Sequence, residues 1–278
     1  MIADAFYPAR GVRLAVEFDP IDTNTSRVPE DLRRLPFDDP RVIGRFERAA
    51  DHLLSKLSHT EIVPFSIGNE IDGLLGDDRA RWDQYARFFS AAADHVGKRR
   101  PGTPVGAKVM RPALLAPEPP GLTRLLEASN VTLATYYPLK ADFSVREPSV
   151  VGGDLERLMK RHPERPVYLL ETGYPSSAGS HSTPGRQARF VREMFRTWDR
   201  LRPRLRLVSF EWLHDLSPTD VEGYARHFGL GSRGFAAYLG SLGLRSRDGR
   251  DKPAFRALLE ESAWRGWAKK PEAGATMP

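Results

Sequence analysis

The chain has 278 residues, 40% of them hydrophobic, which is enough apolar material for a large core. Its formal charge is +6, but basic and acidic residues alternate along the chain, so the pattern is typical of solvated helix faces and argues against nucleic-acid binding. The absence of cysteine excludes disulfides and thiolate metal sites. No apolar run reaches the roughly 18 to 20 residues of a membrane span, and no secretory signal is visible, which leaves the localisation open.

Apolar, β-branched segments alternate with helical patterns along most of the chain. The predicted strands are 11–19, 61–69, 103–110, 131–137, 166–172 and 205–213. The predicted helices are 40–57, 79–99, 121–129, 153–162, 183–200 and 253–267. Alternation with short connections predicts right-handed crossovers and a parallel sheet covered by helices. A doubly wound sheet would fit the same order, but no glycine-rich phosphate loop follows an early strand, so a barrel is favoured.

Two of the predicted helices carry further signals. The aromatic residues of 79–99 recur at helical spacing, which indicates packing against a core; they are Trp82, Tyr85, Phe88 and Phe89. Thr183 followed by Pro184 predicts the start of the helix 183–200, with the threonine as its cap.

Two glutamates stand where predicted strands end. The strand 61–69 leads into Asn69 and Glu70, and the strand 166–172 delivers Glu171. Functional residues of α/β barrels lie at such strand ends, and glutamate is rarely buried without a partner. The two strands are three βα units apart, so we expect the carboxyl groups to face each other across the mouth of the barrel. A pair of carboxylates on either side of one bond is what glycoside hydrolysis requires.

Other polar or aromatic residues at strand ends are candidate substrate contacts. Tyr136 and Tyr137 are adjacent in a strand, so at most one of them can face the site, where it could donate to a carboxylate. Trp212 offers an apolar platform for a sugar ring, and His214 lies just beyond the last strand. Plainer roles stay open for these residues: barrel-mouth packing for Trp212, loop polarity for His214, loop capping for Asn69 and an arginine ion pair for Glu70.

The motifs at these strand ends resemble those of clan A of the glycoside hydrolases. They are GNE at 68–70, YYP at 136–138, ETGYPSS at 171–177 and the later tryptophan. The segment IGNEIDGLL is most similar to the arabinogalactan endo-β-1,4-galactanases, and ETGYPSS is similar both to these and to the plant-type endo-β-1,3-glucanases. The likeness spans about residues 11–260.

This resemblance implies a retaining (β/α)₈ enzyme. It makes Glu70 the acid/base, Asn69 its sugar-binding neighbour and Glu171 the nucleophile. It also suggests Tyr136 or Tyr137 as the tyrosine after strand 6 and Trp212 as the aromatic residue of strand 8. The fold expected is therefore a TIM-type (β/α)₈ barrel, with a single catalytic domain over 1–268 and a disordered tail over 269–278.

The alignment with clan A leaves strands 1 and 2 without a counterpart. If Glu70 ends strand 4 and Glu171 ends strand 7, then 11–19 is strand 3 and 205–213 is strand 8. Six βα units are therefore visible. A late start of the reading frame, a fragment and a natural six-stranded remnant would each explain the gap, and we favour the first because the rest of the frame is intact.

The function expected is that of a retaining glycoside hydrolase acting on a β-linked polysaccharide or oligosaccharide. We expect a carbohydrate substrate, no cofactor or metal, no nucleic acid and a monomer. The first alternative is a truncated or non-catalytic carbohydrate-binding remnant of such an enzyme. The second is a metal-dependent barrel enzyme that uses the carboxylates as ligands.

Overall fold

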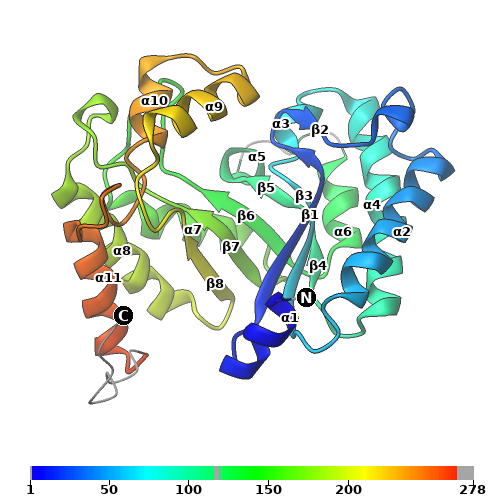
Figure 1. Cartoon of the computed structure of the whole chain (residues 1–278), viewed down its shortest axis with the longest axis horizontal. Helices are drawn as coiled ribbons and strands as arrows, with labels where there is room; N and C mark the ends of the chain where they lie inside the picture. Colours follow the sequence, from blue (N-terminus) through cyan, green and yellow to red (C-terminus); the bar gives the residue numbers. More distant parts are fainter. Residues whose placement is uncertain (1, 116–118, 120, 268–278) are drawn as a thin grey trace. The chain divides into compact units, whose positions relative to one another are not determined.

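The computed structural model describes residues 2–115, 119 and 121–267, so the tail expected at 269–278 lies outside the described residues. The chain divides into two compact units (Figure 1). Unit 1 comprises Met1–Tyr136, Arg157–Thr172 and Pro203–Ser209. Unit 2 comprises Tyr137–Glu156, Gly173–Arg202 and Phe210–Pro278.

The strands of unit 1 form two four-stranded sheets, ordered β2-β1-β3-β4 and β5-β6-β7-β8. Their bounds are β1 Leu14–Asp22, β2 Thr25–Ser26, β3 Ile62–Asn69, β4 Val105–Gly106, β5 Lys108–Met110, β6 Thr132–Tyr136, β7 Val167–Thr172 and β8 Leu205–Phe210, whose last residue belongs to unit 2. Strand β3 pairs in parallel with β1 and β4, and β6 pairs in parallel with β5 and β7. All six predicted strands are present, with the predicted strand 103–110 divided into the shorter β4 and β5. The described strands show no hydrogen-bonded closure into a barrel.

The helices of unit 1 alternate with its strands as the pattern predicted, apart from α1, which precedes β1. They are α1 Ile2–Phe6, α2 Pro40–Ser55, α3 Asp72–Leu75, α4 Arg79–Arg99, α5 Arg111–Leu115 and α6 Leu122–Ala128, with the 3₁₀ turns η1 Pro8–Arg10 and η2 Glu30–Leu32. Helix α7, Val150–Arg161, begins in unit 2 and ends in unit 1. The short helices α3 and α5 were not predicted. None of the described helices combines the length and apolar character needed to cross a membrane.

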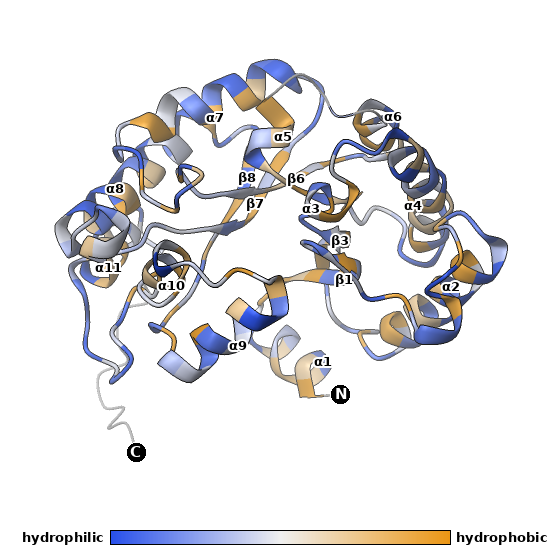
Figure 2. Ribbon diagram, turned by 90° about the horizontal axis from the view of Figure 1, so that it is seen from above, coloured by the Kyte–Doolittle hydropathy of each residue, from blue (hydrophilic) through white to orange (hydrophobic). Residues whose placement is uncertain are grey.

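Capping and apolar spacing explain the long helices of unit 1. Helix α2 starts where the Asp39 side chain accepts from the Arg41 amide, and helix α4 starts at a similar cap made by Asp78. Figure 2 shows that α2 carries both hydrophilic and hydrophobic residues. The four aromatic residues of α4 are fully buried, which confirms their prediction as packing residues: Trp82, Tyr85, Phe88 and Phe89.

Unit 2 is built on helices packed through two apolar clusters. Its elements are η3 Ala178–Ser180, α8 Pro184–Leu201, α9 Pro218–Phe228, α10 Arg233–Leu239 and α11 Pro253–Trp264. Thr183 caps α8 by accepting from the Arg186 amide, as the sequence predicted. One cluster joins α8 to α11 through Val191, Phe195 and Ala257. The other centres on Phe235 and Tyr238 of α10.

The end of β3 is held by a close contact at Gly68. Its φ is +94°, and the Tyr85 hydroxyl, which donates to the Ile67 carbonyl, lies where a Cβ would be placed. That Cβ would lie 2.4 Å from the Tyr85 oxygen and 2.5 Å from a methyl carbon of Ile71. Only glycine fits both the backbone angle and the space at position 68. The backbone conformation just before Asn69 and Glu70 therefore depends on this glycine.

We expect Gly68→Ala to destabilise the protein more than Gly102→Ala does. Gly102 also has a positive φ, +85°, but no atom lies within 4 Å of the position that a Cβ would take there. The control should therefore lose only the backbone term of about 1–2 kcal/mol, whereas Gly68→Ala should lose roughly 1–3 kcal/mol more through overpacking. Free energies of unfolding from urea titrations measure both, and equal losses would contradict the close contact at Gly68.

Candidate functional site

The two predicted glutamates meet in unit 1 through a threonine of the strand between them. Thr135 of β6 is the register partner of Glu171 in β7. Its hydroxyl donates to Glu70 Oε1 at 2.7 Å. Strand β3, which ends at Asn69, and strand β7 belong to different sheets, yet this threonine contacts the first glutamate and pairs with the second. The structure therefore brings Glu70 and Glu171 to one place, although their roles remain predictions.

Glu70 is a partly exposed carboxyl with two hydroxyl donors. Besides Thr135, the hydroxyl of Thr23 donates to its Oε2 at 3.0 Å. Burial of the carboxyl, and next the charge of Glu171, raise the pKa of Glu70 to about 7 against the opposing effect of these hydrogen bonds. Glu70 also adopts a positive φ of 43°, a conformation that non-glycine residues rarely take and that is concentrated at functional sites.

Glu171 is in a different environment, because it forms an ion pair with a buried lysine. Lys108 Nζ of β5 lies 2.5 Å from Glu171 Oε1 and also donates to Glu17 Oε2 of β1. The side chain of Lys108 is 1% exposed, whereas those of Glu171 and Glu17 are 22% and 27% exposed. Burial works against the charged lysine, but the charges of Glu171 and Glu17 outweigh it and raise the pKa of Lys108.

Sequence reasoning missed both Lys108 and Glu17. The signal was a lysine inside the apolar run 103–110, since lysine is almost never fully buried without a partner. The identity of that partner was not visible, because it depends on which strands lie beside β5.

Asn69, which the resemblance to clan A suggests as a sugar-binding residue, forms a hydrogen bond within the protein. Its side-chain Nδ2 donates to Asp22 Oδ1 at 3.0 Å, and Asp22 also accepts from Arg27. The Oδ1 atom of Asn69 is buried and accepts no hydrogen bond. One of the two amide hydrogens of Asn69 is therefore engaged with Asp22.

Asp19 provides a second unsatisfied oxygen in the same unit. Its Oδ1 is buried without a hydrogen-bond partner. Burial, followed by the charge of Glu17, raises the pKa of Asp19 to about 7. Asp19 is thus half protonated near neutral pH and can either accept from a hydroxyl group or donate to one.

The other predicted substrate contacts are distributed over both units. Tyr136 is fully buried in β6, where its carbonyl accepts from the Thr172 hydroxyl. Tyr137, Trp212 and His214 belong to unit 2. Tyr137 and Trp212 pack against the cluster around Phe235, and His214 is exposed. Their assignment as substrate contacts stays a prediction.

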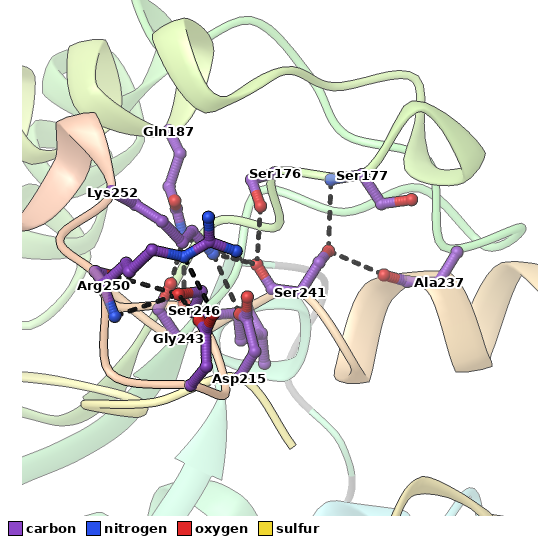
Figure 3. Close-up of polar contacts among 12 residues, drawn as sticks. Ser176, Ser177, Gln187, Asp215, Ala237, Ser241, Gly243, Ser246, Arg250 and Lys252 are labelled. Atoms are coloured by element: carbon purple, nitrogen blue, oxygen red, sulfur yellow. Dashed lines mark hydrogen bonds and ion pairs between the residues drawn. The ribbon is translucent and has the colours of Figure 1, made fainter. Parts of the chain in front are cut away.

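The segment that carries Trp212 and His214 is fixed within unit 2 by a dense polar network (Figure 3). The Trp212 carbonyl accepts from the Leu244 amide at 2.9 Å, and the Asp215 amide donates to the Arg245 carbonyl at 2.9 Å. Lys252 Nζ lies 2.9 Å from Asp215 Oδ1. Figure 3 also shows Gln187, whose Nε2 donates to the Leu242 and Gly243 carbonyls. These bonds hold the loop after β8 in one conformation.

Among residues 2–115, 119 and 121–267, no group of three or more histidine, aspartate or glutamate side chains is arranged to hold a metal ion. The arrangement in unit 1 is instead a set of carboxyl groups with unequal partners. Glu70 receives hydroxyl donors, and Glu171 receives an ammonium group. Two carboxyls in unlike environments can divide proton donation and nucleophilic attack between them.

No family model matches the sequence, and no curated protein is significantly similar to it. Solved structures match its fold. GH5_18 from Bifidobacterium longum matches with a TM-score of 0.71 at 17% identity, over 94% of this chain and 63% of its own. GH5_18 from Streptomyces cattleya, solved in complex with GlcNAc, matches with a TM-score of 0.66 at 20% identity, over 95% of this chain and 65% of its own.

A β-1,3-glucanosyltransferase from Rhizomucor miehei, in complex with laminaritriose, matches with a TM-score of 0.59 at 15% identity, over 91% of this chain and 79% of its own. The chain has the fold of clan A glycoside hydrolases over most of its length. This confirms the recognition made from the motifs at the level of the fold. The chain spans slightly less than two thirds of the length of the two GH5_18 proteins.

We expect Glu70→Gln to stabilise the protein above neutral pH. Folding raises the pKa of Glu70 from 4.5 to about 7, so the stability that its neutral form contributes is complete below the lower value and is lost as the pH rises through the upper one. Glutamine cannot ionise, so the free energy of unfolding of the variant should exceed that of the wild type by about 1–3 kcal/mol at about pH 8. The two free energies should match at about pH 4.5.

Urea titrations at the two pH values measure this difference. The control is Glu61→Gln, which removes the charge of an exposed glutamate just before β3. A gain for Glu70→Gln that is equal at both pH values, or that the control shares, would contradict the raised pKa of Glu70.

Proposed function

We propose that the chain is a retaining glycoside hydrolase that cleaves a β-linked oligosaccharide or polysaccharide with Glu70 and Glu171. The observation that carries the proposal is the contrast between the two glutamates that Thr135 brings together. The pKa of Glu70 is raised to about 7, so a substantial fraction of this carboxyl is protonated near neutral pH, while Glu171 accepts from the buried ammonium of Lys108. A retaining mechanism needs one protonated and one ionised carboxyl group beside the same bond.

The first step forms a glycosyl-enzyme. The Glu171 carboxylate attacks the anomeric carbon, the glycosidic C–O bond breaks, and the proton of Glu70 goes to the departing oxygen. In the second step Glu70, now a carboxylate, takes a proton from water, whose oxygen attacks the same carbon and releases Glu171. Each glutamate returns to its starting state, and two inversions retain the configuration.

The polar side chains around the two glutamates fit a polyhydroxylated substrate. Thr23 and Thr135 contact Glu70, and Asp19 lies within electrostatic range of Glu171. Such groups can exchange hydrogen bonds with sugar hydroxyls. The identity of the sugar and linkage is left open by the proposal.

We expect Glu171→Ala to abolish turnover of activated aryl β-glycosides and Glu70→Ala to lower it by about 10²- to 10⁴-fold. The second variant should form the glycosyl-enzyme from a dinitrophenyl glycoside, whose leaving group needs no proton, and then hydrolyse it slowly. Azide should restore its turnover, because this small anion needs no general base. Glu61→Gln, at the opposite end of β3 from Glu70, is the matched control and should keep wild-type rates.

Intact-protein mass spectrometry of the Glu70→Ala variant should show one added sugar, located on Glu171 by peptide mapping. A sugar on another residue would refute the assignment of the nucleophile. Binding of oligosaccharide by a wild-type protein that turns over no glycoside would favour the non-catalytic remnant.

A further inference from the structure

Lys108 is a buried cation with partners on two other strands. It lies in β5 with its side chain 1% exposed, and it donates to Glu17 of β1 and to Glu171 of β7. A lone buried ammonium is strongly unfavourable, and even a paired one needs good geometry and filled hydrogen-bonding positions to offset its desolvation. Two short charge-assisted bonds meet that need, and they fix both the lysine and its partners in place.

Further carboxylates lie within electrostatic range of this lysine or of its partners. Glu17, Asp19 and Asp22 come from β1, and Glu70 follows β3. Arg27 pairs with Asp22 at 3.1 Å, at the far end of β1 from Glu17. Two carboxylates therefore share the one ammonium group of Lys108, and the charge that reaches Glu171 depends on whether Glu17 is ionised.

From this geometry we infer that Lys108 is the positioning residue of Glu171, holding its carboxylate ionised and oriented, and that Glu17 sets how much of the lysine charge Glu171 receives. The nucleophilic role of Glu171 rests on the proposed function, but the effect of Lys108 and Glu17 on its charge does not. Loss of Lys108 would remove the ammonium group that both carboxylates contact. Loss of the Glu17 charge would leave Lys108 to Glu171 alone.

The pairing of Lys108 depends on whether Glu17 is ionised. Burial raises the pKa of Glu17, so acidification neutralises Glu17 in a range where an exposed glutamate is still charged. As Glu17 becomes neutral, the attraction between Lys108 and Glu171 is no longer divided.

Opposite shifts for two substitutions test this inference. We expect Lys108→Met to move the ¹³C NMR titration midpoint of the Glu171 carboxyl up by roughly 1–3 pH units, the effect of removing an opposite charge at contact distance. Glu17→Gln keeps the shape of the side chain and should move the same midpoint down. The Glu171 midpoint of the double variant should fall between the midpoints of the two single variants. The Glu171 resonance is assigned as the one missing from Glu171→Gln.

Lys98→Met is the matched control, since Lys98 also pairs with a carboxylate, Asp94, but on an exposed helix surface. It should leave the Glu171 midpoint unchanged. If Lys108→Met does not fold, Glu17→Gln and the double variant still test the sign. A Glu171 midpoint that Lys108→Met leaves in place, or that Glu17→Gln also moves up, would overturn the inference.

The NMR titration requires no turnover, so it separates this inference from the proposed function. Where glycosidase activity is present, the acid limb of the pH profile of kcat/KM should shift in the same order. Its midpoint should lie at the lowest pH for Glu17→Gln and at the highest pH for Lys108→Met. A lysine that only supports the fold would lower all rates without moving the limb. Opposite midpoint shifts in a protein without glycosidase activity would support the inference and reject the proposed function.

Discussion

The buried ammonium group of Lys108 is the constraint on which the arrangement of unit 1 depends. Lysine cannot stay charged in a nearly inaccessible position unless carboxylates come to it, and here they come from β1 and β7. Because these strands lie in different sheets, the ion pairs join the two sheets at the site. Breaking either pair leaves a desolvated charge, so the same interaction that organises the site also makes its members hard to replace singly.

Near Lys108, the carboxyl groups of Glu70 and Glu171 have different hydrogen-bonding partners. Threonine hydroxyls from the turn after β1 and from β6 hold Glu70 in a partly desolvated position, where it resists ionisation. Glu171, one strand over from Thr135, is paired with an ammonium instead. This arrangement lowers the free energy of unfolding above neutral pH, because a carboxyl whose pKa is raised by folding destabilises the folded state once it ionises. Such a cost is common where chemistry rather than stability determines the residue.

The comparisons and the site bear on function at different levels. Identities of 15–20% with TM-scores of 0.59–0.71 establish a clan A fold and leave the activity to be argued from the side chains. Within unit 1 the side chains offer a carboxyl with a raised pKa beside a second carboxyl that pairs with an ammonium group. Trp212 and His214 sit on a loop that a separate network in unit 2 holds in place.

The sequence by itself determined the alternation of the main strands and helices, the parallel pairing and the glutamates after β3 and in β7, because apolar period, capping and strand-end polarity are local patterns. It did not predict the helices α3, α5, α9 and α10. It also located the cap of α8 and the buried aromatics of α4. The tertiary structure alone decided that Lys108 would bridge Glu17 and Glu171, and that the amide of Asn69 would be used on Asp22. It likewise placed Thr135 between the glutamates. Such pairings join residues 47 to 91 positions apart, and they follow from strand register and neighbouring strands, which no local pattern encodes.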